Sequence, residues 1–178
     1  MKCYYYLSPT LAETESVSDD LHKSGVNDWF IHIISKNEAG LNRRHLHSSN
    51  YLETMDFLRE GLIGAAFGFI VGLIAAALIS FFDPFGPELP LIAYLGVIAL
   101  FTLHGAWQGG LVGISTENKK LQHFHNDIES GKYLILVYAH QNEEEKIHAM
   151  MTRLHPEAQF VGVDSQFYNP FTEPKLVA

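Results

Sequence analysis

The residues that decide the fold are 62–116, which read LIGAAFGFIVGLIAAALISFF at 62–82, DPFGPE at 83–88 and LPLIAYLGVIALFTLHGAWQGGLVGIST at 89–116. No Lys, Arg, Asp or Glu interrupts either long apolar run, although 18% of the chain is charged. A helix of about 20 apolar residues crosses a hydrocarbon core about 30 Å thick. Both runs reach that length, so we predict a transmembrane helical hairpin at 61–116, with spans at 62–82 and 89–116. The alternative is a pair of buried helices in a soluble core, which seldom run this long without a charge.

The short connection at 83–88 contains two prolines and a glycine, which end a helix and reverse the chain. The residues before and after the hairpin must then lie on one side of the membrane. Basic residues flank the hairpin at Arg43, Arg44 and Arg59 before it and at Lys119, Lys120 and Lys132 after it. The connection carries only Asp83 and Glu88, so the positive-inside rule predicts that both termini are cytoplasmic. The single cysteine, Cys3, fits a reducing compartment.

Each predicted span carries three glycines at intervals of four residues: Gly64, Gly68 and Gly72 in the first, and Gly105, Gly109 and Gly113 in the second. This spacing places small residues along one helix face, where two backbones can approach closely. Because glycine costs about 1 kcal/mol in a helix interior relative to alanine, six in register indicate a helix-packing role. Either the two glycine faces meet within one chain, or at least one packs against a neighbouring subunit of a homo-oligomer.

The second span also carries a polar stripe of His104, Gln108 and Ser115, which fall within about 40° of one another on a helix of about 3.6 residues per turn. His104 lies near the middle of the membrane by residue count, where an ionisable group suggests a functional site. The stripe is therefore a candidate pathway lining or proton relay. Alternatively, His104 is neutral and hydrogen-bonded to a neighbouring helix.

The flank at 1–60 predicts one half of an α+β domain. Residues 2–7 form an aromatic strand, and residues 28–34 predict a second strand. Between them, Thr10 and Glu13 make a capping box for a helix that Gly25 ends.

The flank at 117–168 repeats this order, with a strand at 132–139, a helix capped by Asn142, and a strand at 159–163. Strand–helix–strand twice over is the ferredoxin-like βαββαβ plan. We therefore predict a ferredoxin-like cytoplasmic domain that is split by the inserted hairpin and followed by a tail at 169–178. Separate folding of the halves is the alternative, although each has only two predicted strands.

Several stretches carry a resemblance: Tyr4-Tyr5-Tyr6-Leu7, Ile31-His32-Ile33-Ile34-Ser35, Ala39-Gly40-Leu41 followed by His45-Leu46-His47, and Gly61 to Gly72. With them the chain resembles functionally uncharacterised bacterial membrane proteins, whose short cytoplasmic halves are related to general stress protein 17M and are split by a glycine-rich transmembrane hairpin. The resemblance covers the chain loosely. It implies the split fold and a bacterial inner (plasma) membrane location, and it implies no activity or site residue.

Ten histidines suggest a metal site, above all the pairs His45 with His47 and His123 with His125. In an extended segment, residues i and i+2 point to the same side, and such imidazole pairs can chelate Zn²⁺ or Cu²⁺. The hairpin returns the chain to the same side of the membrane, so the two pairs could meet. In a helix the members of each pair would diverge, which is the alternative. Protonation of several histidines below about pH 6.5 would instead make a pH sensor.

Composition excludes other classes of protein. A net charge of −8 without a basic cluster argues against nucleic acid as a partner, and 12% aromatic residues argue against disorder. The sequence contains no P-loop, dinucleotide-binding glycine motif, nucleophile elbow or His-Glu-x-x-His motif, so we do not expect an enzyme.

Two functions remain. One is a homo-oligomeric membrane protein that forms or gates a pathway for ions or small solutes under control of the cytoplasmic domain. The other is a membrane-anchored sensor or interaction module, with or without a bound metal, that has no pore.

Overall fold

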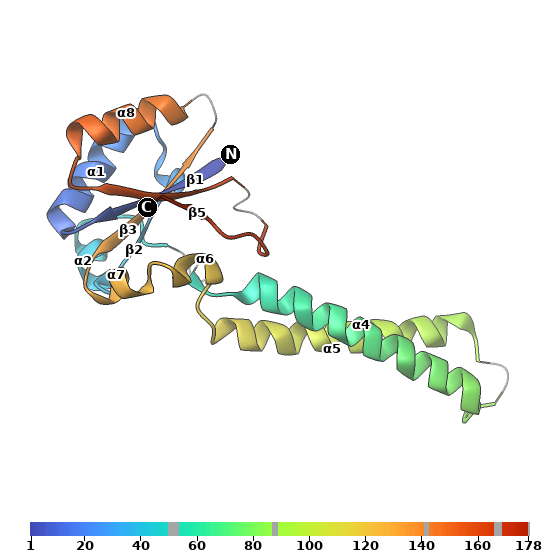
Figure 1. Ribbon diagram of the computed structural model, residues 1–178. Coiled ribbons are helices and arrows are strands. Elements are labelled where there is room, and N and C mark those ends of the chain that lie inside the picture. The colour runs from blue at the N-terminus through green and yellow to red at the C-terminus, as the bar shows by residue number, and fades with distance from the viewer. Residues whose placement is uncertain (50–53, 87–88, 141–142, 166–168, 178) are drawn as a thin grey trace. The chain divides into compact units, whose positions relative to one another are not determined.

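The computed structural model describes residues 1–49, 54–86, 89–140, 143–165 and 169–177. The chain divides into two compact units, one comprising Met1–Thr54 with Lys119–Ala178 and the other comprising Met55–Asn118. The first, which we call the sheet unit, confirms the predicted mixed α+β class (Figure 1). The second, which we call the hairpin unit, is helical. Two sequence expectations, the Asn142 cap and the last two residues of the 83–88 connection, fall outside the described residues.

The sheet unit is built on a five-stranded sheet with the order β2-β3-β1-β4-β5. The strands are β1 (Lys2–Ser8), β2 (Ile31–Ile34), β3 (Tyr133–Ala139), β4 (Gln159–Asp164) and β5 (Lys175–Leu176). All neighbouring strands pair antiparallel. The N-terminal strand β1 is central, since it pairs with β3 from Lys2↔Ala139 to Ser8↔Tyr133 and with β4 on its other edge. The sheet therefore joins residues from both sides of the hairpin in the sequence.

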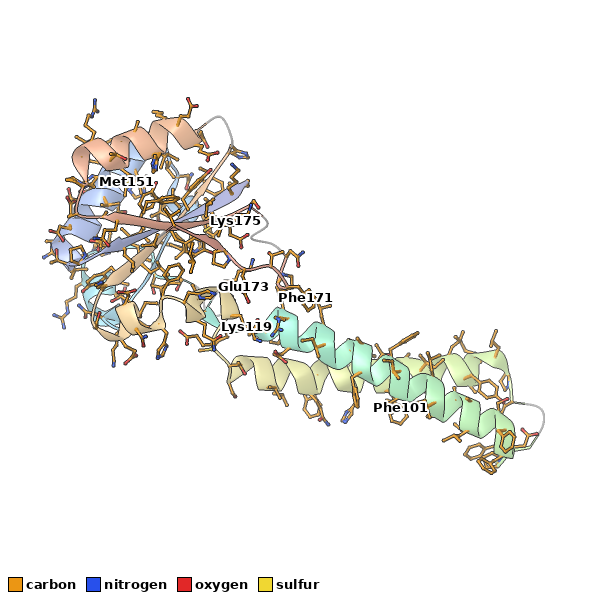
Figure 2. All side chains as sticks on the ribbon, in the orientation of Figure 1. Phe101, Lys119, Met151, Phe171, Glu173 and Lys175 are labelled. Carbon is orange, nitrogen blue, oxygen red and sulfur yellow. The ribbon has the colours of Figure 1, made fainter. Side chains whose placement is uncertain are left out.

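Helices α1 (Leu11–Lys23) and α8 (Glu144–Leu154) cover one face of the sheet, and α2 (Glu38–Arg43) adds Leu41 to the same core (Figure 1). Thr10 caps the start of α1 as predicted, because its hydroxyl accepts from the Glu13 backbone N–H. The same hydroxyl donates to the Glu13 carboxylate at 2.8 Å. Met151, labelled in Figure 2, lies on α8 and is 1% exposed in this core. Full burial of a side chain of this kind contributes about 1.5–3 kcal/mol.

The opposite face is covered by two short helices, α6 (Lys119–Gln122) and α7 (His125–Glu129), in the region where helix was the alternative to an extended histidine pair. Leu121 and Phe124 pack there against β1 and β3, and the Phe124 ring stacks on the Tyr5 ring with centroids 5.4 Å apart. The residues that directly follow the hairpin unit are therefore part of the sheet core.

The predicted strand at 28–34 is wrong in its first three residues. Asp28–Phe30 form the 3₁₀ turn η1 (Asp28–Phe30), because the Asn27 side chain accepts a hydrogen bond from the Trp29 N–H at 3.1 Å and starts a turn. The pairing with β3 begins only at Ile31. Trp29 consequently lies on the surface with 74% of its area exposed.

The hairpin unit contains α4 (Phe57–Phe82) and α5 (Leu91–Ile114), which lie side by side and run in opposite directions (Figure 1). Both helices are long and apolar enough to cross a membrane. Helix α4 begins five residues earlier than the uncharged run and includes Arg59 and Glu60. It ends at Asp83, whose left-handed φ of 46° lets its N–H bond to the Ile79 carbonyl.

Candidate functional site

The six predicted packing glycines all lie in the contact between α4 and α5: Gly64, Gly68, Gly72, Gly105, Gly109 and Gly113. We call this contact the glycine seam. A methyl group added to Gly64 would overlap the backbone of Gly105, and one added to Gly105 would overlap the backbone of Gly64. The helices are thus so close that any side chain larger than hydrogen at these positions must push them apart.

The seam extends over most of the length of the hairpin. An added Cβ would lie 2.9 Å from the Ile98 Cα at Gly72 and 2.7 Å from the Phe57 Cα at Gly113. Gly96, by contrast, faces open space. Both glycine faces are thus occupied within one chain, so the glycine spacing itself gives no argument for a neighbouring subunit.

The base of the hairpin is closed by backbone contacts between the two helices' ends. The Asp56 N–H donates to the Thr116 carbonyl at 3.0 Å, and Met55 forms an antiparallel bridge with Glu117. Arg59 lies within 3.4 Å of Asp56 and 3.0 Å of Glu60. These contacts fix the register in which the glycine seam closes.

Two of the three predicted polar-stripe residues lie together on the surface of α5. The Gln108 side-chain nitrogen is 2.8 Å from His104 Nε2, which is within hydrogen-bonding distance. Both residues are exposed, and the Trp107 ring, 61% exposed, lies 5.7 Å from the His104 ring. Ser115 is the C-terminal cap of α5, about 10 Å further along the helix axis than Gln108, and does not join this pair.

The outward surfaces of both helices are otherwise apolar. Large side chains with more than two thirds of their area exposed occur along both helices: Phe67, Phe81, Phe82, Leu91, Ile92 and Leu103. Figure 2 shows side chains projecting from the ribbon along the hairpin, with Phe101 of α5 labelled. The His104–Gln108 pair is therefore a polar interruption of an apolar surface.

Neither predicted metal-binding histidine pair lies in a strand. His45 has a left-handed φ of 56° in the turn after α2, and His123 and His125 lie in the α6–α7 region. His47 Nδ1 is 3.7 Å from Asp28, whereas His123 Nε2 is 3.6 Å from Glu173. Among the described residues, no group of three or more His, Cys, Asp or Glu side chains is placed to hold a metal ion.

Sequence reasoning missed Asp28 as a contact point for histidines. Its carboxylate is 3.2 Å from His22 Nε2 on one oxygen and 3.7 Å from His47 Nδ1 on the other. The buried His32 ring contacts the His47 ring edge-on at 5.2 Å and bonds through Nε2 to the Trp29 carbonyl at 3.0 Å. These contacts were missed because a strand was expected at 28–34. The sequence Asn27-Asp28, which is common in turns, was the signal that could have identified the turn.

A buried ion pair lies on the sheet face that α6 covers. Lys120 Nζ is 2.6 Å from Asp164 Oδ2, and their side chains are only 5% and 2% exposed. Lys120 comes from α6, two residues after the hairpin unit ends, and Asp164 ends β4. This pair fixes the start of the second flank to the sheet.

Two of the hollows on the surface of the sheet unit have titratable side chains in their lining. The larger, about 240 Å³, is lined by residues that include Tyr6, His148 and Phe160; the Tyr6 hydroxyl lies 3.4 Å from His148 Nδ1. Burial, and then the Glu144 carboxylate, raises the pKa of Tyr6, so the phenol stays protonated. Thr152 and His155 also line this hollow, and His155 Nε2 lies 3.1 Å from the Asp20 carboxylate.

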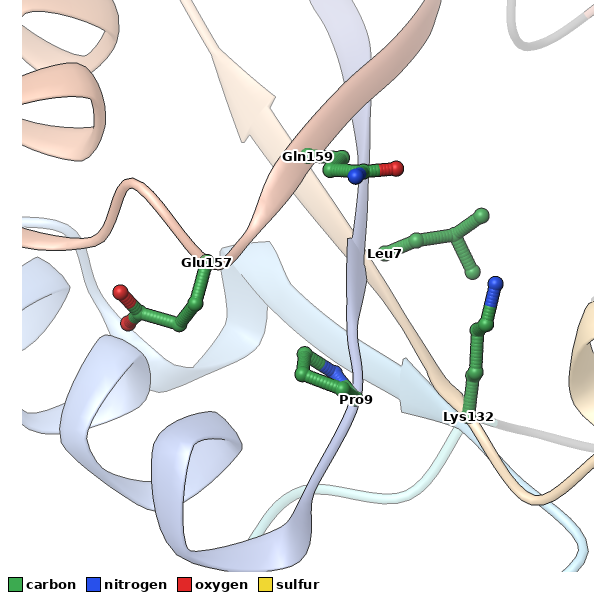
Figure 3. A pocket seen from close by; sticks show the side chains of 5 residues that line it. All are labelled: Leu7, Pro9, Lys132, Glu157 and Gln159. Carbon is green, nitrogen blue, oxygen red and sulfur yellow. The ribbon is translucent and has the colours of Figure 1, made fainter.

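The smaller hollow, about 90 Å³, is lined by Leu7, Pro9, Lys132, Glu157 and Gln159 (Figure 3). Lys132 Nζ already pairs with Asp127 at 2.7 Å. Glu157 turns its carboxylate away from the hollow (Figure 3) and lies 3.2 Å from His155 Nδ1. The two charged side chains that line this hollow, Lys132 and Glu157, are therefore paired with residues outside it and do not converge on it.

No protein-family model, curated protein sequence or solved structure matches this chain. Of the residues predicted as functional, the geometry brings together the six glycines and the His104–Gln108 pair. The glycine seam performs a packing task that is complete within the chain. The His104–Gln108 pair on α5 remains exposed, so its packing is not complete within the chain.

Proposed function

We propose that this chain is a homo-oligomeric integral protein of the bacterial inner membrane, with α4 and α5 inserted as a hairpin and both termini in the cytoplasm. The continuous apolar surface of the hairpin supports insertion, since soluble monomers rarely expose apolar patches beyond a few hundred Å². Exposures of 70% for Phe67 and 81% for Phe81 are typical of side chains in contact with lipid. The positive charges on both flanks support the cytoplasmic orientation.

The observation that carries the proposal of assembly is the exposed His104–Gln108 pair. One hydrogen bond joins the Gln108 amide nitrogen to His104 Nε2. The second ring nitrogen of His104 and the rest of the Gln108 amide then face hydrocarbon. A polar group without a partner in the membrane core costs several kcal/mol. Association of α5 with the α5 of another copy supplies partners for those groups, with hydrogen bonds that each contribute about 0.6–2 kcal/mol in membranes.

A pathway for ions or small solutes would have to run between copies, along this face of α5. Within one chain the glycine seam leaves no space between the helices. In this proposal a ferredoxin-like cytoplasmic domain controls the pathway. The strand order β2-β3-β1-β4 with antiparallel neighbours, and two helices on one face, support that assignment of the domain.

The alternative function, a membrane-anchored sensor or interaction module without a pore, is favoured by one observation. The polar face is short, because the exposed Leu100 and Leu111 lie one turn before and one turn after the His104–Gln108 pair. A water-filled pathway needs polar lining over the whole membrane, whereas a contact between copies needs only this turn.

Native mass spectrometry of the protein in lipid nanodiscs tests the assembly. We expect a defined oligomer for the natural chain and a shift towards monomer for the double variant His104→Ala, Gln108→Ala. The matched control is Leu103→Ala, which removes a 70% exposed apolar side chain from the same helix and should leave the oligomer intact. A monomeric natural chain would refute the proposal.

Ion efflux from proteoliposomes separates the two functions. A pathway predicts efflux that is changed by His104→Ala, whereas the anchor alternative predicts an oligomer without efflux. Measured together with the mass, efflux therefore distinguishes failure of the pore from failure of assembly.

A further inference from the structure

Trp29 and Phe30 form an exposed aromatic pair on the surface of the sheet unit. Trp29 is 74% exposed and Phe30 is 38% exposed. Their orientation is imposed locally, because the Phe30 N–H bonds to the Asn27 carbonyl at 2.9 Å while the Asn27 side chain holds the Trp29 N–H. The two rings are therefore presented by a hydrogen-bonded turn, and the core of the unit does not use the Trp29 ring.

The pair is linked to the segment that leads to the hairpin. The Trp29 ring lies 5.8 Å from the His47 ring. The backbone around His47 is bonded to the β2 edge: the Ile33 N–H donates to the His47 carbonyl and the Ser49 N–H donates to the Ile33 carbonyl, each at 3.0 Å. Helix α4 begins at Phe57, eight residues after Ser49, and eight residues span at most about 28 Å.

A second, shorter connection acts on the other side of the hairpin. Thr116, just after α5, is four residues from Lys120, a length of at most about 14 Å. Lys120 is buried against Asp164 in the sheet unit. Once the hairpin is in the bilayer, the two connections confine the sheet unit to the membrane surface, and the longer one carries the Trp29 contact.

We propose that Trp29 and Phe30 are a membrane-interface anchor whose rings insert among the lipid headgroups of the cytoplasmic leaflet. This inference rests on the proposed insertion of the hairpin. Tryptophan concentrates at that depth because its large apolar ring carries one N–H that still finds a polar partner. A protein partner is the less fitting occupant, because the two connections keep the sheet unit of every copy within reach of the bilayer, whatever the number of copies in the assembly.

The charges around the pair fit a headgroup layer. The adjacent carboxylate of Asp28 is faced by His22 and His47. Arg43, in the last turn of α2, is four residues from His47. Basic side chains and protonated imidazoles are attracted to the anionic lipids of the cytoplasmic leaflet.

Tryptophan fluorescence in bilayers of brominated lipid tests the anchor, since the chain has only two tryptophans. The variant Trp107→Phe leaves Trp29 as the single emitter. We expect Trp29 to lose more emission with bromines near the headgroup than with bromines near the chain end. Leu154→Trp, combined with Trp29→Phe and Trp107→Phe, places an emitter at a 47% exposed position at the end of α8, and this control should lose none.

A third single-tryptophan chain tests the hairpin separately. Phe67→Trp, with Trp29→Phe and Trp107→Phe, places the emitter ten residues into α4, about 15 Å along its axis, and it should be quenched most by bromines near the chain end. If position 67 is unquenched, the membrane proposal itself fails. If position 67 is quenched and Trp29 is not, the hairpin is inserted but the anchor is refuted, and a blue-shifted Trp29 emission would then indicate a protein partner. Equal quenching of Trp29 and position 154 would also refute the anchor.

Discussion

The Lys120–Asp164 ion pair should be among the most sensitive contacts in the sheet unit, and its energetics can be tested quantitatively. Both side chains are almost fully buried, with Nζ and Oδ2 2.6 Å apart. Removal of one partner leaves the other charge buried, which costs about 3–5 kcal/mol in comparable cases. We therefore expect Lys120→Met and Asp164→Leu each to lower the free energy of unfolding by that amount. The double variant should recover most of the loss, because apolar replacement of both partners of a buried pair is close to neutral.

The assay is urea unfolding of the full chain in mild detergent, followed by near-ultraviolet circular dichroism of the tyrosines buried in the sheet. Lys132→Met is the matched control, because Lys132 pairs with Asp127 at nearly the same distance, 2.7 Å, but the two side chains are 43% and 34% exposed. That exposed pair should contribute less than about 1 kcal/mol. The reasoning is refuted if the double variant is destabilised by the sum of the two single effects, or if Lys120→Met costs no more than Lys132→Met.

Two other perturbations follow from the described contacts. Gly68→Ala should separate α4 from α5 and lower the thermal stability of the hairpin unit, because an added Cβ meets the Phe101 backbone. The control Gly96→Ala, at an open position, should be neutral or stabilising by up to about 1 kcal/mol. Equal effects of the two variants would contradict the close packing of the glycine seam. The Lys2 ammonium, which donates a hydrogen bond to Glu144 at 2.9 Å, lowers the pKa of Glu144 below its ordinary value of 4.5. The contribution of Glu144 to stability is therefore present above pH 4.5 and is lost as the pH falls through the lowered pKa. Glu144→Gln should show a smaller loss of stability between about pH 5 and pH 3 in urea titrations, and an unchanged pH profile would contradict this assignment.

The hairpin could be predicted in detail because its determinants are local in the sequence. An uncharged run of membrane length needs no knowledge of tertiary contacts. The glycine spacing also identifies the contact face, since residues four apart share one side of a helix. The sequence left open whether that face met the same chain or another copy. The three-dimensional structure answers this question: Gly64 faces Gly105 of the same chain.

The sheet unit was predictable in its long elements and not in its short ones. Strongly apolar strands such as 133–139 can be recognised from their composition. Helices α6 and α7 are four and five residues long, too short for a helical period to appear in the sequence. Strand β5 has only two residues and forms because β4 offers an edge. At η1 a local hydrogen bond from the Trp29 N–H to the Asn27 side chain outweighed the β propensity of the aromatic residues that follow Asp28.

For the candidate site residues as well, local contacts could be predicted from the sequence and non-local contacts could not. The His104–Gln108 pair could be predicted because residues i and i+4 of a helix are neighbours, and the two are bonded in the structure. The Asp28 cluster could not, because it joins residues from α1, η1 and the segment after α2. Contacts of this kind depend on how a sheet edge and its helices are packed, which no single stretch of sequence specifies.

The central position of β1 has a consequence for how the protein is made. Strand β1 leaves the ribosome well before β3, yet Lys2 of β1 pairs with Ala139 of β3. At about 5–20 residues per second, synthesis of the intervening chain takes on the order of ten seconds, and throughout that time the aromatic strand has neither neighbour. In the proposed topology β3 reaches β1 only after the hairpin has turned back to the cytoplasm. In that topology, a nascent chain that failed to turn back would leave the two strands in different compartments, so completion of the sheet would require that both spans had been inserted.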